Sequence, residues 1–176
     1  MGNSAEAPYA ITTPGTYYDV TPRVLRNIIS YPFNGTFTST VTVATANSIP
    51  QITQGNEVMA FNHTAQSLSS MLEFEVFTNV ANTALNAGSF LWMALFADYS
   101  PDALVVAPSW ANYTVPSSVY FKHYMMPVSL NPIRYSIRMA GASANIVVNW
   151  YQYGGRTQSR VTVKEWSGLS LGNVAP

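Results

Sequence analysis

Two acidic residues are the first feature of this sequence whose type and spacing could do chemistry. Glu73 and Glu75 alternate with apolar residues over 72–76, which is the pattern of a half-buried strand. Side chains two apart on a strand project from the same face, roughly 7 Å apart. Paired carboxylates at about that distance carry out glycoside hydrolysis, so a glycosidase is one hypothesis. A solvent-exposed strand face accounts for the same pair and is the interpretation that we favour.

Further reactive groups are scarce. The chain has no cysteine, which excludes disulfides, thiolate metal sites and a cysteine nucleophile. His63 and His123 are the two histidines, and neither stands near carboxylates at the spacing of metal ligands. No glycine-rich phosphate loop follows a predicted strand. We therefore predict no enzyme, no metal and no cofactor.

Aromatic side chains are the other candidates for contact with a ligand. With 11 Tyr, 8 Phe and 4 Trp, the chain has enough of them to stack on sugars in a carbohydrate-binding sandwich. Aromatic residues also lie at the covered centres of protein interfaces, so contacts between subunits explain them without a ligand. The residues in question are Tyr17, Tyr18, Trp110, Tyr113, Tyr120, Tyr124, Trp150, Tyr151 and Tyr153.

The chain is poor in charge. Eight basic and eight acidic residues cancel and make up 9% of the sequence, against about 25% in an ordinary soluble protein. Because 48% of the residues are apolar, a free monomer would have little electrostatic protection against self-association. The basic residues are scattered and form no stripe that could neutralise phosphates. We expect a protein that associates with itself or with a partner and does not bind nucleic acid directly.

Alternation of apolar and polar residues predicts the strands that would position these side chains. A continuous apolar run at residues 90–96 indicates a central strand that is buried on both faces. Residues 133–139, 145–153 and 159–166 are expected to form a three-stranded meander, and residues 108–116 a loop. The other expected strands lie at residues 36–43, 58–61, 72–76, 103–106 and 118–124.

About eight strands without a long helical period predict an all-β fold, a single eight-stranded jelly-roll β-sandwich or barrel. An immunoglobulin-like sandwich stays open as an alternative. Residues 1–35 are rich in Pro, Gly, Asn, Thr and Tyr and are expected to form an extended N-terminal arm, and residues 36–176 the single domain. We recognise neither a signal peptide nor a membrane-spanning run, so we expect synthesis in the cytoplasm.

The overall character of the chain resembles the small single-jelly-roll coat proteins of tailless icosahedral viruses. The features that carry the resemblance are the irregular Pro-rich start, the strands between residues 36 and 166, the lack of cysteine, the low charge and the abundance of Tyr, Asn and Thr. The size is most similar to the smaller major capsid protein of the membrane-containing sphaerolipoviruses, bacteriophages of Thermus. The resemblance implies a virion protein that forms homodimers, joins another major capsid protein and stands over an internal lipid membrane.

A coat protein would assemble through repeated contacts between neutral surfaces. Each contact can be weak, because many subunits act together. The candidate contact residues are Tyr17, Tyr18, Val24, Leu25, Ile28, Ile29, Trp110, Tyr113 and Trp166. Three hypotheses therefore stand after the sequence: a coat protein, a carbohydrate-binding module of a phage or toxin, and a glycosidase.

Overall fold

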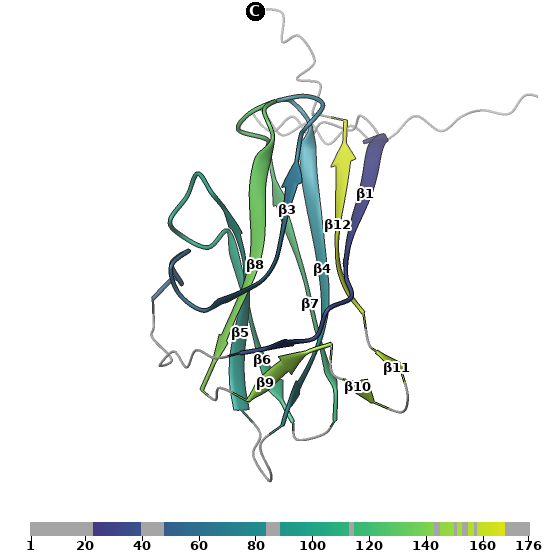
Figure 1. Cartoon of the computed structure of the whole chain (residues 1–176). Coiled ribbons are helices and arrows are strands. Elements are labelled where there is room, and N and C mark those ends of the chain that lie inside the picture. Colours follow the sequence, from purple (N-terminus) through teal and green to yellow (C-terminus); the bar gives the residue numbers. More distant parts are fainter. Residues whose placement is uncertain are drawn as a thin grey trace, which may run out of the picture.

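The computed structural model describes residues 23–39, 48–83, 89–112, 115–142, 145–149, 151–152, 155–156 and 158–167. Within these ranges the regular elements are β-strands, and they form two antiparallel sheets packed as a sandwich (Figure 1). The predicted all-β fold is therefore confirmed. None of the described elements is a helix that could cross a membrane.

The larger sheet is built around the long strand β4. Its main strand order is β1, β12, β4 and β7, while β9 and β2 lie beside the part of β4 that extends past β12. The strands of this sheet are β1 (Leu25–Phe33), β2 (Phe37–Thr38), β4 (Met71–Asn82), β7 (Ser117–Met125), β9 (Ile146–Val148) and β12 (Ser159–Trp166).

The second sheet has four strands in the order β3, β8, β5 and β6. These strands are β3 (Asn56–His63), β5 (Ser89–Ala97), β6 (Val105–Ala111) and β8 (Ile133–Gly141). A separate small ribbon pairs β10 (Tyr151–Gln152) with β11 (Gly155–Arg156).

The long strands pair in a nested order along the chain. The first pairs with the last (β1 with β12), then β3 pairs with β8, β4 with β7, and the innermost two, β5 and β6, with each other. This antiparallel ribbon is rolled up, so that β12 also pairs with β4 and β8 with β5. The result is a jelly roll, which confirms the predicted fold over the immunoglobulin-like alternative.

The core lies between the two sheets and follows the alternation in the sequence. In β4, Leu72, Phe74 and Val76 are buried and point inward. Strand β5 is buried without a break over residues 91–97, because its outer face is covered as well: Trp92 and Phe96 pack there against residues such as Ile52. The predicted central strand with two buried faces is therefore confirmed.

The layer over β5 and β8 comes from residues 50–55, which we call the covering segment. Its Ile52 N–H donates to the carbonyl of Pro101 in the β5–β6 turn. At the end of the segment, Gly55 has φ +67°, and a Cβ there would lie 2.7 Å from the Met139 carbonyl oxygen and 2.8 Å from the Trp92 ring. Only glycine tolerates both the backbone angle and the approach.

The predicted three-stranded meander is wrong. Strand β8 pairs with β3 and β5, whereas β9 pairs with β4 and β2, and β12 pairs with β1 and β4. The chain therefore changes sheets after Gly141. Alternation shows which side chains are buried, but it does not show which strand lies alongside, and the prediction assumed pairing between neighbours in sequence.

Two predicted element boundaries also need correction. Residues 108–116 are not wholly a loop, because β6 continues through Pro108 and Trp110. Pro108 is tolerated because β6 is an edge strand, where a missing N–H costs no ladder hydrogen bond. The strand expected over residues 36–43 is observed only as β2, and residues 40–47 lie outside the described part.

The first part of the chain is more ordered than the predicted arm over residues 1–35. Residues 25–33 form β1, the edge strand of the larger sheet, so they belong to the sandwich. Residues 1–22 lie outside the described part. An extended arm in that stretch stays a prediction.

Candidate functional site

The outer face of the larger sheet is a regular grid of side chains. Directly paired residues of antiparallel strands project from the same face, so the register defines rows that cross β1, β12, β4 and β7. We call this surface the outer grid. From β1 to β7 its three rows are Ile28, Lys164, Glu73 and Tyr124; Ser30, Thr162, Glu75 and Lys122; and Pro32, Arg160, Phe77 and Tyr120.

A cluster of ion pairs occupies the centre of the outer grid. Lys122 Nζ lies 2.9 Å from Glu73 Oε1 and 2.7 Å from Glu75 Oε1. Lys164 Nζ lies 2.6 Å from Glu75 Oε2 and 3.6 Å from Glu73 Oε1. Glu73 is only 5% exposed, and Trp166 Nε1 donates to its Oε2 at 2.8 Å. The two acids share one face as predicted, but they are paired and partly covered instead of freely solvated.

Both carboxylates of this cluster are held in the ionised form. Hydrogen bonds from Lys122 and Lys164 lower the pKa of Glu75 to about 2. Burial would raise the pKa of Glu73, but hydrogen bonds from Lys122 and Trp166 outweigh it and lower that pKa too. A glycosidase needs one carboxylic acid with a raised pKa to protonate the leaving group. Neither glutamate has that property, so the site does not support the glycosidase hypothesis.

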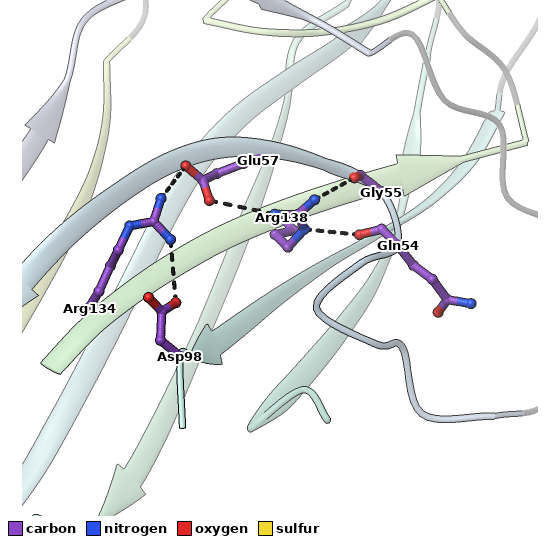
Figure 2. A network of polar contacts seen from close by, with 6 residues as sticks. All are labelled: Gln54, Gly55, Glu57, Asp98, Arg134 and Arg138. Atoms are coloured by element: carbon purple, nitrogen blue, oxygen red, sulfur yellow. Dashed lines mark hydrogen bonds and ion pairs between the residues drawn. The ribbon is translucent and has the colours of Figure 1, made fainter. Parts of the chain in front are cut away.

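The outer face of the second sheet carries another ion-pair cluster (Figure 2). Arg134 lies 2.6 Å from Glu57 and 3.3 Å from Asp98, measured between guanidinium nitrogen and carboxylate oxygen. Arg138 Nη1 lies 3.5 Å from the other oxygen of Glu57. Arg138 also donates to two backbone carbonyls, those of Gln54 at 3.0 Å and Gly55 at 2.9 Å. This cluster therefore ties the covering segment to β8.

Each cluster contains two acids and two bases and is neutral by itself. Together they hold half of the charged residues of the chain. Paired charges contribute little net field beyond their own cluster, because opposite charges a few ångströms apart largely cancel, and salt screens the remainder beyond about one Debye length. The centre of each sheet face is thus polar but carries no net charge, while Arg160 of the outer grid lies outside its cluster.

Large apolar side chains are exposed around these neutral faces. Two of them, Tyr120 and Tyr124, lie in the outer grid on its edge strand β7. The Tyr120 hydroxyl donates to Glu75 at 3.1 Å. At the end of the sandwich that lies uppermost in Figure 1, the loops at residues 64–70 and 126–132 present further ones. Among the described residues, the large apolar side chains with an exposed fraction of 42% or more are Val24, Leu25, Ile28, Ile49, Leu68, Tyr99, Trp110, Val115, Tyr120, Tyr124, Met126, Val128 and Leu130.

The 64–70 loop is held in place by a buried carboxylate. Glu165 of β12 is fully buried and accepts hydrogen bonds from the backbone N–H groups of Gln66 and Ser67 at 2.9 and 3.1 Å. The Ser70 hydroxyl donates to it as well. These bonds give the buried carboxyl group its partners and hold the loop from which Leu68 is exposed.

A depression of about 520 Å³ lies beside the same end of the sandwich. Its lining combines an exposed tyrosine ring, apolar loop residues and charged groups of the second cluster. The Tyr99 hydroxyl approaches the sulfur of Met125 at 3.9 Å. The lining residues are Asn62, Asp98, Tyr99, Val128, Ser129, Pro132, Ile133 and Arg134.

The predicted contact residues fall in different environments. Val24, Leu25, Ile28 and Trp110 are exposed, so they are available for contact. Ile29 is half-buried, on the inward side of β1, and Trp166 is half-buried with its ring nitrogen bound to Glu73. The remaining candidates, Tyr17, Tyr18 and Tyr113, lie outside the described residues. A role in subunit contact stays a prediction for all of them.

Sequence analysis missed the apolar loop residues Leu68, Met126, Val128 and Leu130, because a loop has no periodicity that marks an exposed position. It also passed over residues 168–172, which read Gly-Leu-Ser-Leu-Gly and match the nucleophile-elbow pattern of hydrolases. That pattern is informative only at a strand-to-helix turn, and these residues lie outside the described part. Among the described residues, no group of three His, Asp or Glu side chains could hold a metal.

Comparison with known proteins gives distant similarities in structure only. No protein-family model matches the sequence, and no curated protein matches it. The structure of the Gx strain of infectious bursal disease virus is similar with TM-score 0.46 and 11% identity over 97% of this chain and 39% of that chain.

Two further structures come from virus particles. A subviral particle of VP2 of infectious bursal disease virus is similar with TM-score 0.39 and 11% identity, over 92% of this chain and 37% of that chain. The full particle of Israeli acute paralysis virus is similar with TM-score 0.26 and 11% identity, over 94% and 83%. This chain thus spans about two fifths of the bursal disease virus chains. At such low scores the similarities carry no argument about function.

Proposed function

We propose that this chain is a viral coat protein, a structural building block that assembles with copies of itself into an icosahedral shell. The observation that carries the proposal is the surface: thirteen large apolar side chains are exposed among the described residues, while eight charged residues of the two sheet faces are paired within two neutral clusters. Such clusters can lose water on assembly without leaving one of their own charges unpaired. The jelly roll is a common fold of coat proteins, but the fold alone would not decide the function.

The finer parts of the proposal follow from the sequence resemblance. The chain would act in the virion after synthesis in the host cytoplasm, form homodimers and join another major capsid protein. Contact with an internal lipid membrane, as in the bacteriophages of the sphaerolipovirus group, belongs to the same proposal. None of these roles requires a catalytic residue, a metal or a cofactor.

The experiment that tests the proposed function is the mass of the purified protein in solution. Light scattering over a concentration series at low and high salt should give a dimer or larger species that persists on dilution. Its mass should change little with salt, because the proposed contacts are apolar and neutral. A monomer at every concentration would contradict the proposal.

A carbohydrate-binding module is the second candidate, and the depression beside Tyr99 favours it. An exposed aromatic ring next to Asp98, Asn62 and Arg134 offers a stacking surface and polar groups, as sugar sites require. Arg134 and Asp98 already bind each other at 3.3 Å, which leaves less capacity for a ligand. A glycan array separates the two functions: specific binding that is lost in Tyr99→Ala would move this candidate to first place.

A further inference from the structure

We propose that two copies of this chain pair face to face through the outer grid, about a two-fold axis that runs parallel to the strands, between β12 and β4. The inference rests on the proposed function, since both require self-association, and it adds the surface and its orientation. A two-fold contact brings the same surface patch of both copies together, so the patch must be complementary to itself.

The outer grid has this self-complementarity. Rotation about an axis along the strands reverses the order of the four strands across the face and keeps the order of the three rows. In the first row, Ile28 of β1 then faces Tyr124 of β7 on the other copy. Basic Lys164 lies opposite the position of acidic Glu73, which is 5% exposed and bound by Lys122 and Trp166 of its own copy. Apolar groups meet apolar groups at the margins, and the two neutral clusters meet at the centre with no like charges opposite each other. Complementarity of this kind favours one orientation over others.

The other two rows match in the same way. In the third row Pro32 faces Tyr120, and the guanidinium of Arg160 faces the ring of Phe77, which suits a cation–π contact. In the second row Thr162, which is 9% exposed, lies opposite Glu75, and Ser30 lies opposite Lys122. Each contact occurs twice, because the axis relates the two copies.

The alternative two-fold axis, across the strands, is unfavourable. It would place each strand opposite the same strand of the other copy and reverse the order of the rows. Lys164 of one copy would then face Arg160 of the other. Like charges placed opposite each other cost several kcal/mol at an interface. Glu73 would at the same time face the ring of Phe77. The charge pattern therefore selects the axis along the strands.

The size of the outer grid limits the strength of the pair. The three rows span five residues of each strand, so four strands about 4.8 Å apart with 3.4 Å per residue cover roughly 330 Å² per copy. The pair would then bury roughly 650 Å² in total through these rows, which is below the size of most specific interfaces. A weak dimer of this kind becomes stable in a shell, where several contacts act together.

The test uses cysteine variants, because the natural chain has no cysteine. Ile28→Cys protein is mixed with Tyr124→Cys protein, one of them carrying a mass tag, and a bis-maleimide of about 10 Å, the spacing of packed sheets, is added. The matched control is Ile28→Cys mixed with Tyr120→Cys. Tyr120 and Tyr124 lie on the same strand and are 55% and 51% exposed, but four residues separate them by about 14 Å.

The expected result is a covalent heterodimer of Ile28→Cys with Tyr124→Cys at several times the yield of the control mixture or of either variant alone. All three positions are exposed, so the variants should melt with the parent protein. If light scattering shows an oligomer but both mixtures cross-link equally poorly, the outer grid is not the contact and the proposed function stands. A protein that is monomeric at every concentration would overturn both.

Discussion

The two ion-pair clusters contain the same numbers of acids and bases, yet they serve their sheets differently. On the larger sheet the lysines bind carboxylate side chains of the same sheet, and Ile28, Tyr120 and Tyr124 around them are exposed. On the second sheet Arg138 also binds the backbone of Gln54 and Gly55 and so fastens the covering segment over β5 and β8. Charge composition alone does not distinguish an open face from a covered one.

The difference shows which face is free for a partner. The covered face has already buried its apolar residues, Trp92 and Phe96, within the same chain. The open face keeps Ile28, Tyr120 and Tyr124 exposed beside a neutral centre. We infer that the second cluster acts mainly in folding and that the first is kept for contact between molecules.

The largest expected effect comes from disrupting the packing of the covering segment at Gly55. Gly55→Ala should lower the free energy of unfolding by about 2–4 kcal/mol, because the new Cβ meets backbone and ring atoms at a strained backbone angle. Gly35→Ala is the matched control: its Cβ would lie 3.2 Å from the end of the Phe33 ring, so the loss should stay below about 1 kcal/mol. Urea unfolding measures both. Equal losses would show that the covering segment is not packed as described.

A smaller effect is expected from the arginines of the second cluster. Arg138→Met removes donors to two backbone carbonyls and should cost about 1–3 kcal/mol. Arg134→Met removes ion pairs whose side chains are 33–48% exposed and should cost at most about 1 kcal/mol. The two variants have the same change in charge, and the ion pair of Arg138 with Glu57 is the longer one, at 3.5 Å. A larger loss in Arg138→Met on urea unfolding would therefore measure mainly the backbone bonds. A larger loss in Arg134→Met than in Arg138→Met would show that the ion pairs of Arg134 stabilise the fold more than the backbone bonds of Arg138.

Alternation in the sequence predicted most of the fold because burial of alternate side chains is a local property. The inward residues of β4 and the twice-covered strand β5 were identified in this way. Pairing is not local: β8 and β12 lie in different sheets although their sequences look alike. The predicted meander failed for that reason, and the nested order of the jelly roll became visible only from the register.

Only part of the outer grid could be predicted from the sequence. That Glu73 and Glu75 share a face follows from their spacing. Their partner Lys122 is 49 residues from Glu73, and Lys164 comes from yet another strand, so the ion-pair cluster needed the fold. Ile28 was a predicted contact residue because it is apolar and near the start of the chain, but its place opposite Tyr124 in the grid depends on the pairing of four strands.

The smallest expected effect concerns Glu75 and separates the clusters by pH. Because hydrogen bonds from Lys122 and Lys164 lower its pKa from 4.5 to about 2, the carboxylate stabilises the fold fully above pH 4.5 and loses this contribution as the pH falls toward 2. Glu75→Gln should therefore cost about 1 kcal/mol at pH 7 and flatten the decline of stability between pH 4.5 and 2. Urea unfolding at a series of pH values measures both. Most of the loss in Arg138→Met should persist in acid, since backbone carbonyls do not titrate. If Glu75→Gln keeps the pH dependence of the parent protein, the acid sensitivity belongs to other carboxylates.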